Sequence, residues 1–226
     1  MGLLERSDVF LISKVFHGQA ERVGTRNSHM YNMEDLTPEQ VTQQVTTEVE
    51  EALVDLGVGY MDLMLLHWPA SANVGRSQDN DVEAITTASL ANRQRRIAAW
   101  KVLEEMFQKG WLRAIGVSNF SEFHLEQLRE DGATIVPMVN QIEASLSVQY
   151  PKIFDYCQQH NILCQAFSPL KRGQLIEDDN DVVEGISTKY TKTAAQIALR
   201  YLIQIGYAVT CLLTNAKRMT SNHGVL

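Results

Sequence analysis

Polar side chains stand where several short apolar runs of this sequence end. Lys14 lies near the end of the run VFLISKV (9–15), and His67 follows the run YMDLMLL (60–66). Similar positions at the ends of later runs are held by Ser118 and Asn119, Asn140 and Gln141, and Ser168. A lysine and a histidine together indicate proton management or carbonyl polarisation, because a buried lysine favours the anion of a neighbouring hydroxyl and a neutral imidazole can hydrogen-bond a carbonyl oxygen. The amide and hydroxyl side chains at the other strand ends are suited to form hydrogen bonds with a carboxamide or a phosphate group of a ligand.

Taken singly, each of these residues also has a purely structural interpretation. A strand-end lysine is usually solvated, and a strand-end histidine often satisfies a backbone carbonyl. Trp68 can serve only in packing, and Ser118 with Asn119 can form a helix cap and a turn. Asn140 and Gln141 can be a buried pair of amides with satisfied hydrogen bonds. We expect His124 and His160 to lie on helices, solvent-facing or capping, without a functional role. The common location of the other residues is what favours a site.

The run from Tyr60 to Pro69 is apolar on both faces, which is typical of a strand in a parallel sheet that is covered on each side. Further runs predict strands over 9–15, 114–119, 138–143, 162–168 and 207–213. Helical patterns separate most of them, so we expect an α/β fold with right-handed crossovers and with the carboxyl ends of the strands at one edge. Periodicity alone leaves an open sheet and a closed barrel as alternatives. Neither GxGxxG after the first strand nor GxxxxGK[ST] is present.

Three helix starts carry clear capping signals. Thr37, Pro38 and Gln40 predict a helix that runs to Gly57 with apolar residues at helical spacing. Ser121 is expected to cap a short helix, and Thr193 with Gln196 another. The helix before 114 should turn Trp100, Leu103 and Phe107 inward and stop at Gly110, and further helices are expected over 151–160 and from 215. Residues 70–91 form a predicted surface insertion.

Composition limits the class of protein. With 226 residues, 45% of them hydrophobic, we expect one domain over 1–226. The net charge of −7 and the lack of a dense basic run argue against a nucleic-acid partner. No apolar run is long enough for a membrane span, no signal-peptide core is present, and the expected location is cytoplasmic. The cysteines Cys157, Cys164 and Cys211 match no metal spacing and are expected to be small buried hydrophobes in a reducing compartment.

Several motifs, in this order, resemble the aldo-keto reductase family: LLHWP, AIGVSNF, VNQIE, AFSPL and TAAQIALRYLIQIG, supported by VFLISKV and AWKVLEEMFQKGWLRAIGVSNFS. The resemblance covers nearly the whole chain. It implies a (β/α)₈ TIM barrel, of which about six of eight strands are present here. It also implies reversible hydride transfer between NADP(H) and the carbonyl carbon of a small aldehyde or ketone substrate. A monomer is expected.

The resemblance assigns roles to individual residues. Lys14 and His67 match the catalytic lysine and the histidine that orients the carbonyl, and Trp68 matches a substrate-pocket wall. The residues that match the cofactor site are Ser118, Asn119 and Gln141 for the nicotinamide carboxamide, Phe167 for ring stacking, Ser168 and Leu170 for the pyrophosphate, and Arg218 and Asn222 for the adenosine 2′-phosphate and adenine. No metal is implied.

Two departures from the family pattern affect these expectations. The family aspartate and tyrosine precede the lysine strand and are absent from this sequence, as are the first two strands and the last helix. Where many members have Pro-Lys-Ser, this chain has Cys211, Leu212 and Leu213, and the missing lysine should weaken a 2′-phosphate contact by about 1.5–3 kcal/mol. The sequence is then interpretable as a fragment of a reductase, a relative that binds a nucleotide or protein without catalysis, or an unstable remnant. Tyr31 is a weak alternative proton donor.

Overall fold

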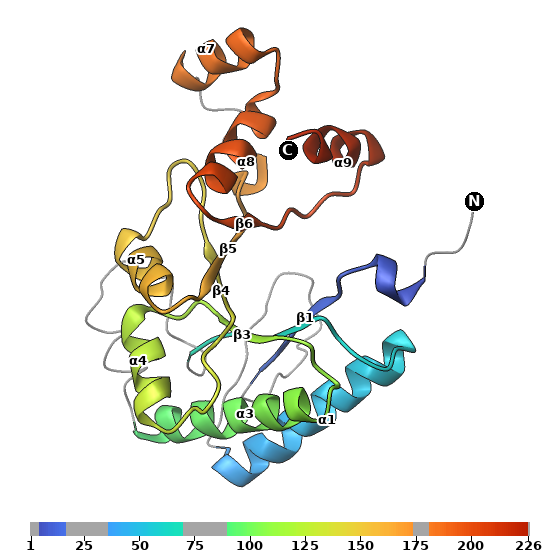
Figure 1. Ribbon diagram of the computed structural model, residues 1–226, viewed down its shortest axis with the longest axis vertical. Coiled ribbons are helices and arrows are strands. Elements are labelled where there is room, and N and C mark those ends of the chain that lie inside the picture. The colour runs from blue at the N-terminus through green and yellow to red at the C-terminus, as the bar shows by residue number, and fades with distance from the viewer. Residues whose placement is uncertain (1–4, 17–35, 70–89, 174–180, 226) are drawn as a thin grey trace. The chain divides into compact units, whose positions relative to one another are not determined.

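A computed structural model describes residues 5–16, 36–69, 90–173 and 181–225 of the chain (Figure 1). The chain divides into two compact units, Met1–Val139 and Asn140–Leu226. The six strands follow one another in the sheet in chain order, and the described pairings of β1 with β2, β2 with β3 and β5 with β6 are all parallel. The predicted α/β class with parallel strands is thereby confirmed. Tyr31, the alternative proton donor, and residues 70–89 of the predicted insertion lie outside the described residues.

In the first unit, helices follow strands as expected. Its elements are η1 (Arg6–Asp8), β1 (Ile12–Val15), α1 (Pro38–Leu56), β2 (Leu63–Leu66), α3 (Leu90–Gln108), β3 (Ile115–Ser118), α4 (Glu122–Glu130) and the start of β4 (Val139–Glu143). Each strand is shorter than its apolar run. Leu90 and Ala91, which the sequence placed in the insertion, already belong to α3. Helices α1 and α3 lie side by side (Figure 1).

The capping signals of α1 are confirmed in detail. The Thr37 hydroxyl accepts from the Gln40 N–H, and the Gln40 side chain accepts from the Thr37 N–H at 2.8 Å. Gly57 ends the helix with φ at 63°, the left-handed conformation that glycine adopts without steric cost. Val41, Val45 and Val49 are fully buried, so one stripe of the helix faces the core.

The start of β2 carries a buried ion pair that ties it to the segment before β1. The Asp62 carboxylate accepts from Arg6 at 2.6 Å and from the Leu11 N–H at 2.8 Å. Burial opposes ionisation, but these hydrogen bonds and the charges of Arg6 and Arg113 hold the pKa of Asp62 below its ordinary value. The Arg6 guanidinium also lies 4.0 Å from the centre of the Tyr60 ring. These contacts explain why a polar residue, Asp62, stands near the start of an otherwise apolar strand.

The second unit holds the rest of β4, then α5 (Pro151–Gln159), β5 (Leu163–Phe167), η2 (Lys171–Gly173), α7 (Asp181–Tyr190), α8 (Ala194–Gln204), β6 (Ala208–Val209) and α9 (Ala216–His223). The Thr193–Gln196 capping box is confirmed. Two predictions were less accurate. Strand β6 is two residues long, because beyond Thr210 the chain leaves β5 and the Leu212 side chain is 96% exposed. Helix α7 was not predicted, and Val183 is its one buried residue.

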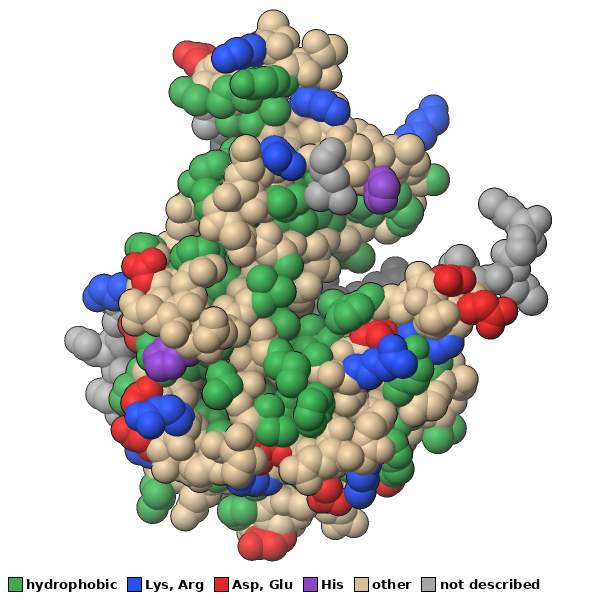
Figure 2. Space-filling view, viewed as in Figure 1, with side chains coloured by type: hydrophobic (Ala, Val, Ile, Leu, Met, Phe, Trp, Pro, Cys, Tyr) green, Lys and Arg blue, Asp and Glu red, His purple; other side chains and the backbone are tan. Residues whose placement is uncertain are grey.

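Within the described ranges, no helix is long and apolar enough to cross a membrane. On the visible face of the first unit, acidic and basic side chains are interspersed (Figure 2). Exposed charged residues of this unit also pair on one helix, as Lys109 does with Glu105 at 2.6 Å. Such exposed pairs stabilise a fold by at most about 1 kcal/mol each. The stability of the first unit therefore depends mainly on its buried side chains.

Gly116 is the most tightly packed of the described glycines in the first unit. A Cβ atom there would lie 2.5 Å from the Val139 carbonyl oxygen and 2.8 Å from a methyl carbon of Leu65. Both contacts are far inside van der Waals distance, so β3 and the start of β4 can approach each other only because position 116 has no side chain.

Gly116→Ala should lower the free energy of unfolding by about 1–3 kcal/mol, because the backbone must shift to admit the methyl group. Urea denaturation followed by circular dichroism measures this. Gly59→Ala is the matched control, since a Cβ at Gly59 meets nothing within 4 Å. Equal stability of the two variants would contradict the packing argument.

Candidate functional site

The register of the first three strands puts three candidate residues on one face of the sheet. Lys14 is level with Leu65, and Leu65 is level with Gly116. His67 and Ser118 lie two residues farther along their strands than Leu65 and Gly116. Side chains two residues apart in a strand point to the same face. The side chains of Lys14, His67 and Ser118 therefore share one face at the carboxyl end of the first-unit strands.

The backbone of His67 is held on both sides. Its N–H donates to the Val15 carbonyl at 2.9 Å, which continues the β1–β2 ladder by one residue. Its carbonyl accepts from Asn119 Nδ2 at 3.0 Å, and the same amide donates to the Ser118 hydroxyl at 3.1 Å. Asn119 has φ at 63°, and asparagine is one of the few residues that tolerate this conformation. The structure thus supports the turn at Asn119, whose amide holds the His67 carbonyl, whereas the cap of the following helix is Ser121.

Aromatic side chains surround the His67 imidazole. The Phe16 ring meets it edge-on, with the two ring centroids 5.9 Å apart. The centroid of the Trp68 ring is also 5.9 Å from that of the imidazole, and these two ring planes are tilted by 30°. His67 is partly exposed, and Trp68 is 39% exposed. A half-exposed imidazole between two rings, one of them open to solvent, is suited to contact a small ligand.

Lys14 is half-buried, and this burial lowers the pKa of its ammonium group. The end of its strand is held by α1. Glu48 accepts from the Phe16 N–H at 3.0 Å and from Gln44 Nε2 at 2.8 Å. Burial raises the pKa of Glu48, although these two hydrogen bonds partly oppose the rise. Sequence reasoning missed Gln44 and Glu48; their i, i+4 spacing beside the buried valine stripe was the available signal.

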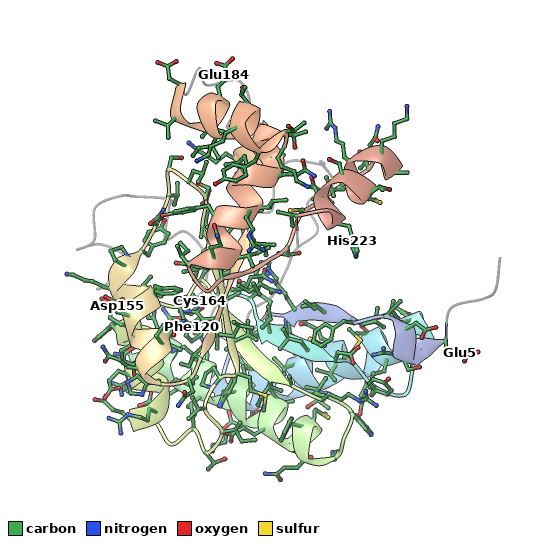
Figure 3. The ribbon with its side chains drawn as sticks, turned by 45° about the horizontal axis from the view of Figure 1, so that its top comes forward. Glu5, Phe120, Asp155, Cys164, Glu184 and His223 are labelled. Atoms are coloured by element: carbon green, nitrogen blue, oxygen red, sulfur yellow. The ribbon has the colours of Figure 1, made fainter. Side chains whose placement is uncertain are left out.

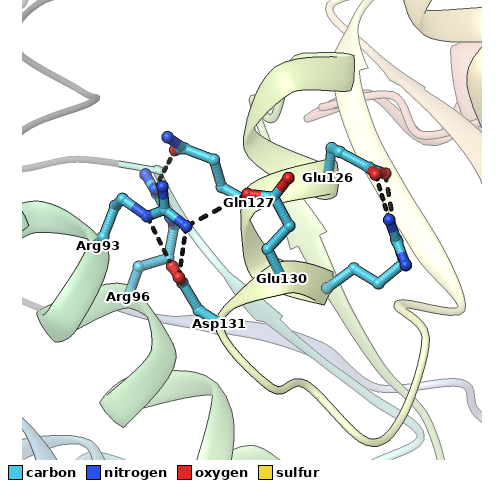
Figure 4. Close-up of polar contacts among 7 residues, drawn as sticks. Arg93, Arg96, Glu126, Gln127, Glu130 and Asp131 are labelled. Atoms are coloured by element: carbon cyan, nitrogen blue, oxygen red, sulfur yellow. Dashed lines mark hydrogen bonds and ion pairs between the residues drawn. The ribbon is translucent and has the colours of Figure 1, made fainter.

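The carboxyl end of β2 is also anchored by a buried arginine. Arg96 is completely buried, and it donates to the Pro69 carbonyl at 2.6 Å and to Gln127 Oε1 at 2.6 Å. Figure 4 shows Arg96 beside Arg93, which forms a two-pronged ion pair with Asp131. Burial lowers the pKa of Arg96 to about 10, which leaves it charged at neutral pH. Sequence reasoning missed Arg96, although it lies four residues before Trp100 on the same inward stripe of α3.

Arg96→Met should lower the free energy of unfolding by about 2–4 kcal/mol, since it leaves the Pro69 carbonyl and the Gln127 amide buried without this donor. Arg129→Met is the control: its side chain is 63% exposed and pairs with Glu126 on the surface of α4 (Figure 4). The control should change stability by less than about 1 kcal/mol. Chemical denaturation of both variants measures the difference, and similar losses in the two would contradict an anchoring role for Arg96.

His124 is buried, so the expectation that it faces solvent was wrong, whereas the expected capping role is confirmed. Its Nδ1 accepts from the Ser121 N–H at 3.1 Å, and the Ser121 hydroxyl accepts from the His124 N–H. The buried Phe120 ring, labelled in Figure 3, lies 5.8 Å from the imidazole. Burial, with a smaller effect of the Arg96 charge, lowers the pKa of His124 to about 3. His160 is exposed at the end of α5, as expected.

Stability should fall as pH drops below the ordinary histidine pKa of about 6.5. Between pH 3 and 6.5 the unfolded chain binds a proton at position 124 that the folded chain excludes, so acid favours unfolding by up to about 1.4 kcal/mol per pH unit. His124→Gln keeps the capping box and removes this titration. Urea midpoints from pH 7 to 5 should therefore fall less steeply in His124→Gln than in the wild type, while His160→Gln should match the wild type. Equal slopes in His124→Gln and wild type would refute the assignment.

In the second unit, alternation separates two faces of β4 and β5. Asn140 reaches Cys157 of α5, with Nδ2 3.8 Å from Sγ, and Cys164 also hydrogen-bonds Cys157. Figure 3 labels Cys164 on β5 and Asp155 on α5. Their neighbours Gln141 and Gln165 therefore point to the face opposite α5. Gln141 is buried, and its Nε2 donates to Gln165 Oε1 at 2.6 Å.

Phe167 lies two residues after Gln165, so its ring is on the same face as the two glutamines. The segment after it turns sharply: Ser168 and Lys171 have φ at 51° and 46°, and the Lys171 N–H donates to the Ser168 carbonyl at 2.9 Å. Leu170 is partly buried in this turn and its carbonyl accepts from the Gly173 N–H at 2.8 Å. The second unit thus presents, in chain order, the buried amide of Gln141, the ring of Phe167 and the tight turn that begins at Ser168.

Arg218 and Asn222 are one helical turn apart on α9, so they lie on the same side of the helix. Arg218 is exposed and Asn222 is partly buried. Asn215 caps this helix by accepting from the Lys217 and Arg218 N–H groups at 2.9 and 3.2 Å. The predicted helix from 215 is confirmed. Among the residues that the structure describes, no group of three histidine, cysteine, aspartate or glutamate side chains could hold a metal ion.

Comparison with known proteins identifies the family of the chain. The family model described as Aldo/keto reductase family matches residues 4–226. The chain belongs to the aldo/keto reductase family. It is 38% identical to the glyoxal reductase of Bacillus subtilis over 157 residues, covering 70% of this chain and 48% of that protein.

Solved structures of the family share the fold. An aldo-keto reductase from a Medee basin deep-sea metagenome library matches with a TM-score of 0.74 and 27% identity, over 100% of this chain and 68% of that one. A Bombyx mori aldo-keto reductase in complex with NADP matches with a TM-score of 0.73 and 27% identity, over 100% and 65%. The predicted aldo-keto reductase fold is confirmed. The chain spans about half to two thirds of the length of its curated relatives, from 48% to 66%.

Proposed function

We propose that this aldo/keto reductase chain binds NADP(H) and contributes to the transfer of a hydride between the nicotinamide and the carbonyl carbon of a small aldehyde or ketone. The observation that carries the proposal is the common face of Lys14, His67 and Ser118 at the strand ends of the first unit. Family membership and the NADP-bound relative support it.

In this proposal the nicotinamide supplies the hydride, and the residues of the first unit act on the substrate. His67 would donate a hydrogen bond from its imidazole to the carbonyl oxygen, and Trp68 would form a wall beside the substrate. Lys14 would favour the anionic form of a neighbouring hydroxyl. The family tyrosine and aspartate precede the lysine strand, so the present sequence holds the lysine and histidine part of that set.

The proposed cofactor contacts are those that the family resemblance assigns. Ser118, Asn119 and Gln141 would bind the carboxamide, and Phe167 would stack on the nicotinamide ring with the flat face that tyrosine has in many relatives. The turn at Ser168 and Leu170 would contact the pyrophosphate, and Arg218 and Asn222 the 2′-phosphate and adenine. Leu212 offers no charge to the 2′-phosphate, so NADP preference would depend on Arg218.

A cytoplasmic, monomeric protein without nucleic-acid or membrane partners remains part of the proposal. The three free cysteines support a reducing compartment. Two of them, Cys157 and Cys164, are completely buried and act as small core side chains.

The purified chain should bind NADPH, and Phe167→Ala should weaken this binding about 2- to 10-fold by removing the stacking surface. Cofactor fluorescence measures the affinity. Phe167→Tyr should bind like the wild type, and Phe123→Ala, at an exposed position of α4, is the control.

A parallel assay with a generic aldehyde measures NADPH-dependent turnover by the same chain. Binding with turnover supports the reductase. Binding without turnover supports the alternative of a relative that binds the nucleotide without catalysis, and absence of NADPH binding by a folded chain would overturn the proposed function.

A further inference from the structure

The two buried cysteines of the second unit lie against each other where the chain turns from α5 into β5. Cys157 is on the last turn of α5, and its carbonyl accepts from the Ile162 N–H at 2.8 Å. Asn161 makes this turn tight by adopting the left-handed conformation, with φ at 56°. Cys164 is two residues beyond Ile162, so both side chains point to the same face of β5. On this face Cys164 hydrogen-bonds Cys157 (Figure 3 labels Cys164).

The hydrogen bonds of the pair converge on one sulfur. The Asn140 amide donates to Cys157, with Nδ2 3.8 Å from Sγ. The contact with Cys157, together with burial, raises the pKa of Cys164, as expected when the Cys164 S–H is the donor. Cys157 Sγ therefore accepts from two groups. Donors directed at a sulfur stabilise its thiolate, which is the form that attacks an oxidant.

Helix α5 covers the pair. Cys157 and Cys164 are completely buried, so an oxidant reaches them only when a neighbouring element opens. Cys157 is the one buried residue of this nine-residue helix, and the half-buried Phe154 ring stacks on the Tyr207 ring with centroids 4.7 Å apart. An element with few buried contacts opens locally at a lower free energy than the whole fold. Opening of α5 would expose Cys157 without unfolding the sheet.

We propose that Cys157 and Cys164 form a peroxide-sensitive dithiol, shielded by α5, that is converted into an intramolecular disulfide. In the open form the Cys157 thiolate attacks one oxygen of hydrogen peroxide, the O–O bond breaks, and a sulfenic acid and a first water form. When α5 closes, the Cys164 sulfur attacks the sulfenic sulfur, the S–O bond breaks, and the second oxygen leaves as water. Two thiols are oxidised, one peroxide is reduced, and the two thiol protons end in the two waters. This inference does not depend on the proposed function.

The bond can be detected in one peptide. Trypsin releases residues 153–171, which contain both cysteines and no methionine. After the purified full chain is treated with hydrogen peroxide, this peptide should lose the mass of two hydrogen atoms. Titration of the denatured chain should show one thiol, Cys211, in place of three. Dithiothreitol should restore all three thiols.

Three cysteine variants identify the partners. Cys157→Ser and Cys164→Ser should each abolish the loss of two hydrogen atoms, because one sulfur of the bond is missing. Cys211→Ser is the matched control and should still form the disulfide. Circular dichroism before the peroxide treatment establishes that each variant is folded.

A second pair of variants tests the shielding by α5. Phe154→Ala should form the disulfide about 2- to 10-fold faster than the wild type, because it removes the ring that stacks on Tyr207 and so favours opening. Lys152→Ala, at an exposed position of the same helix, should match the wild type. The rate is measured by quenching the reaction at intervals and weighing the 153–171 peptide.

Several results would overturn the inference. They are an unchanged mass of the 153–171 peptide in excess peroxide, oxidation of either cysteine to a sulfinic acid in place of the bond, and a link from either cysteine to Cys211 or to a second chain. Equal rates of disulfide formation in a folded Phe154→Ala variant and the wild type would overturn the shielding by α5.

Discussion

The register of the parallel strands β1, β2 and β3 is the constraint on which the first half of the site depends. Because Lys14 is level with Leu65 and Gly116, the lysine, His67 and Ser118 share one face. A slip of one residue between β1 and β2 would turn Lys14 to the opposite face from His67. Gly116 of β3 also lies against the Val139 carbonyl at the start of β4, where no side chain fits. Strand β3 therefore contributes both to the common face and to the close packing of the first unit.

Buried and partly buried polar side chains hold the ends of these strands. The last hydrogen bonds of a parallel ladder leave backbone groups that need other partners. Here Glu48 accepts from the Phe16 N–H, Asn119 donates to the His67 carbonyl, and Arg96 donates to the Pro69 carbonyl. All three side chains come from segments outside β1 and β2. The His67 segment is thus positioned by neighbouring helices and a loop.

Sequence patterns predicted the parts of the fold that are determined locally. Capping boxes at Thr37 and Thr193 need only residues three apart, and a buried parallel strand needs only a continuous apolar run, so both were recognisable. The motif resemblance supplied the family. Strand β6 was overestimated, because an apolar run such as 207–213 does not reveal where its partner strand ends. Helix α7 was missed because it buries little of its surface.

The polar contacts between distant segments were not predictable in the same way. Arg96 and Pro69 are 27 residues apart, and Gln141 and Gln165 are 24 apart, so no local pattern links them. His124 illustrates the same limit, since its capping role follows from Ser121 three residues earlier whereas its burial depends on packing that the helix pattern did not reveal.

The polar residues that matched the family and those that support them therefore differ in kind. Residues that contact a shared ligand recur as motifs, because the ligand imposes the same chemistry on each relative. Residues that position them, such as Arg96, lie outside the motifs that carry the resemblance. A family resemblance can assign Gln141 to a carboxamide, whereas the hydrogen bond from Gln141 to Gln165 is visible only in the structure. The support of such a site therefore comes partly from residues outside the motifs.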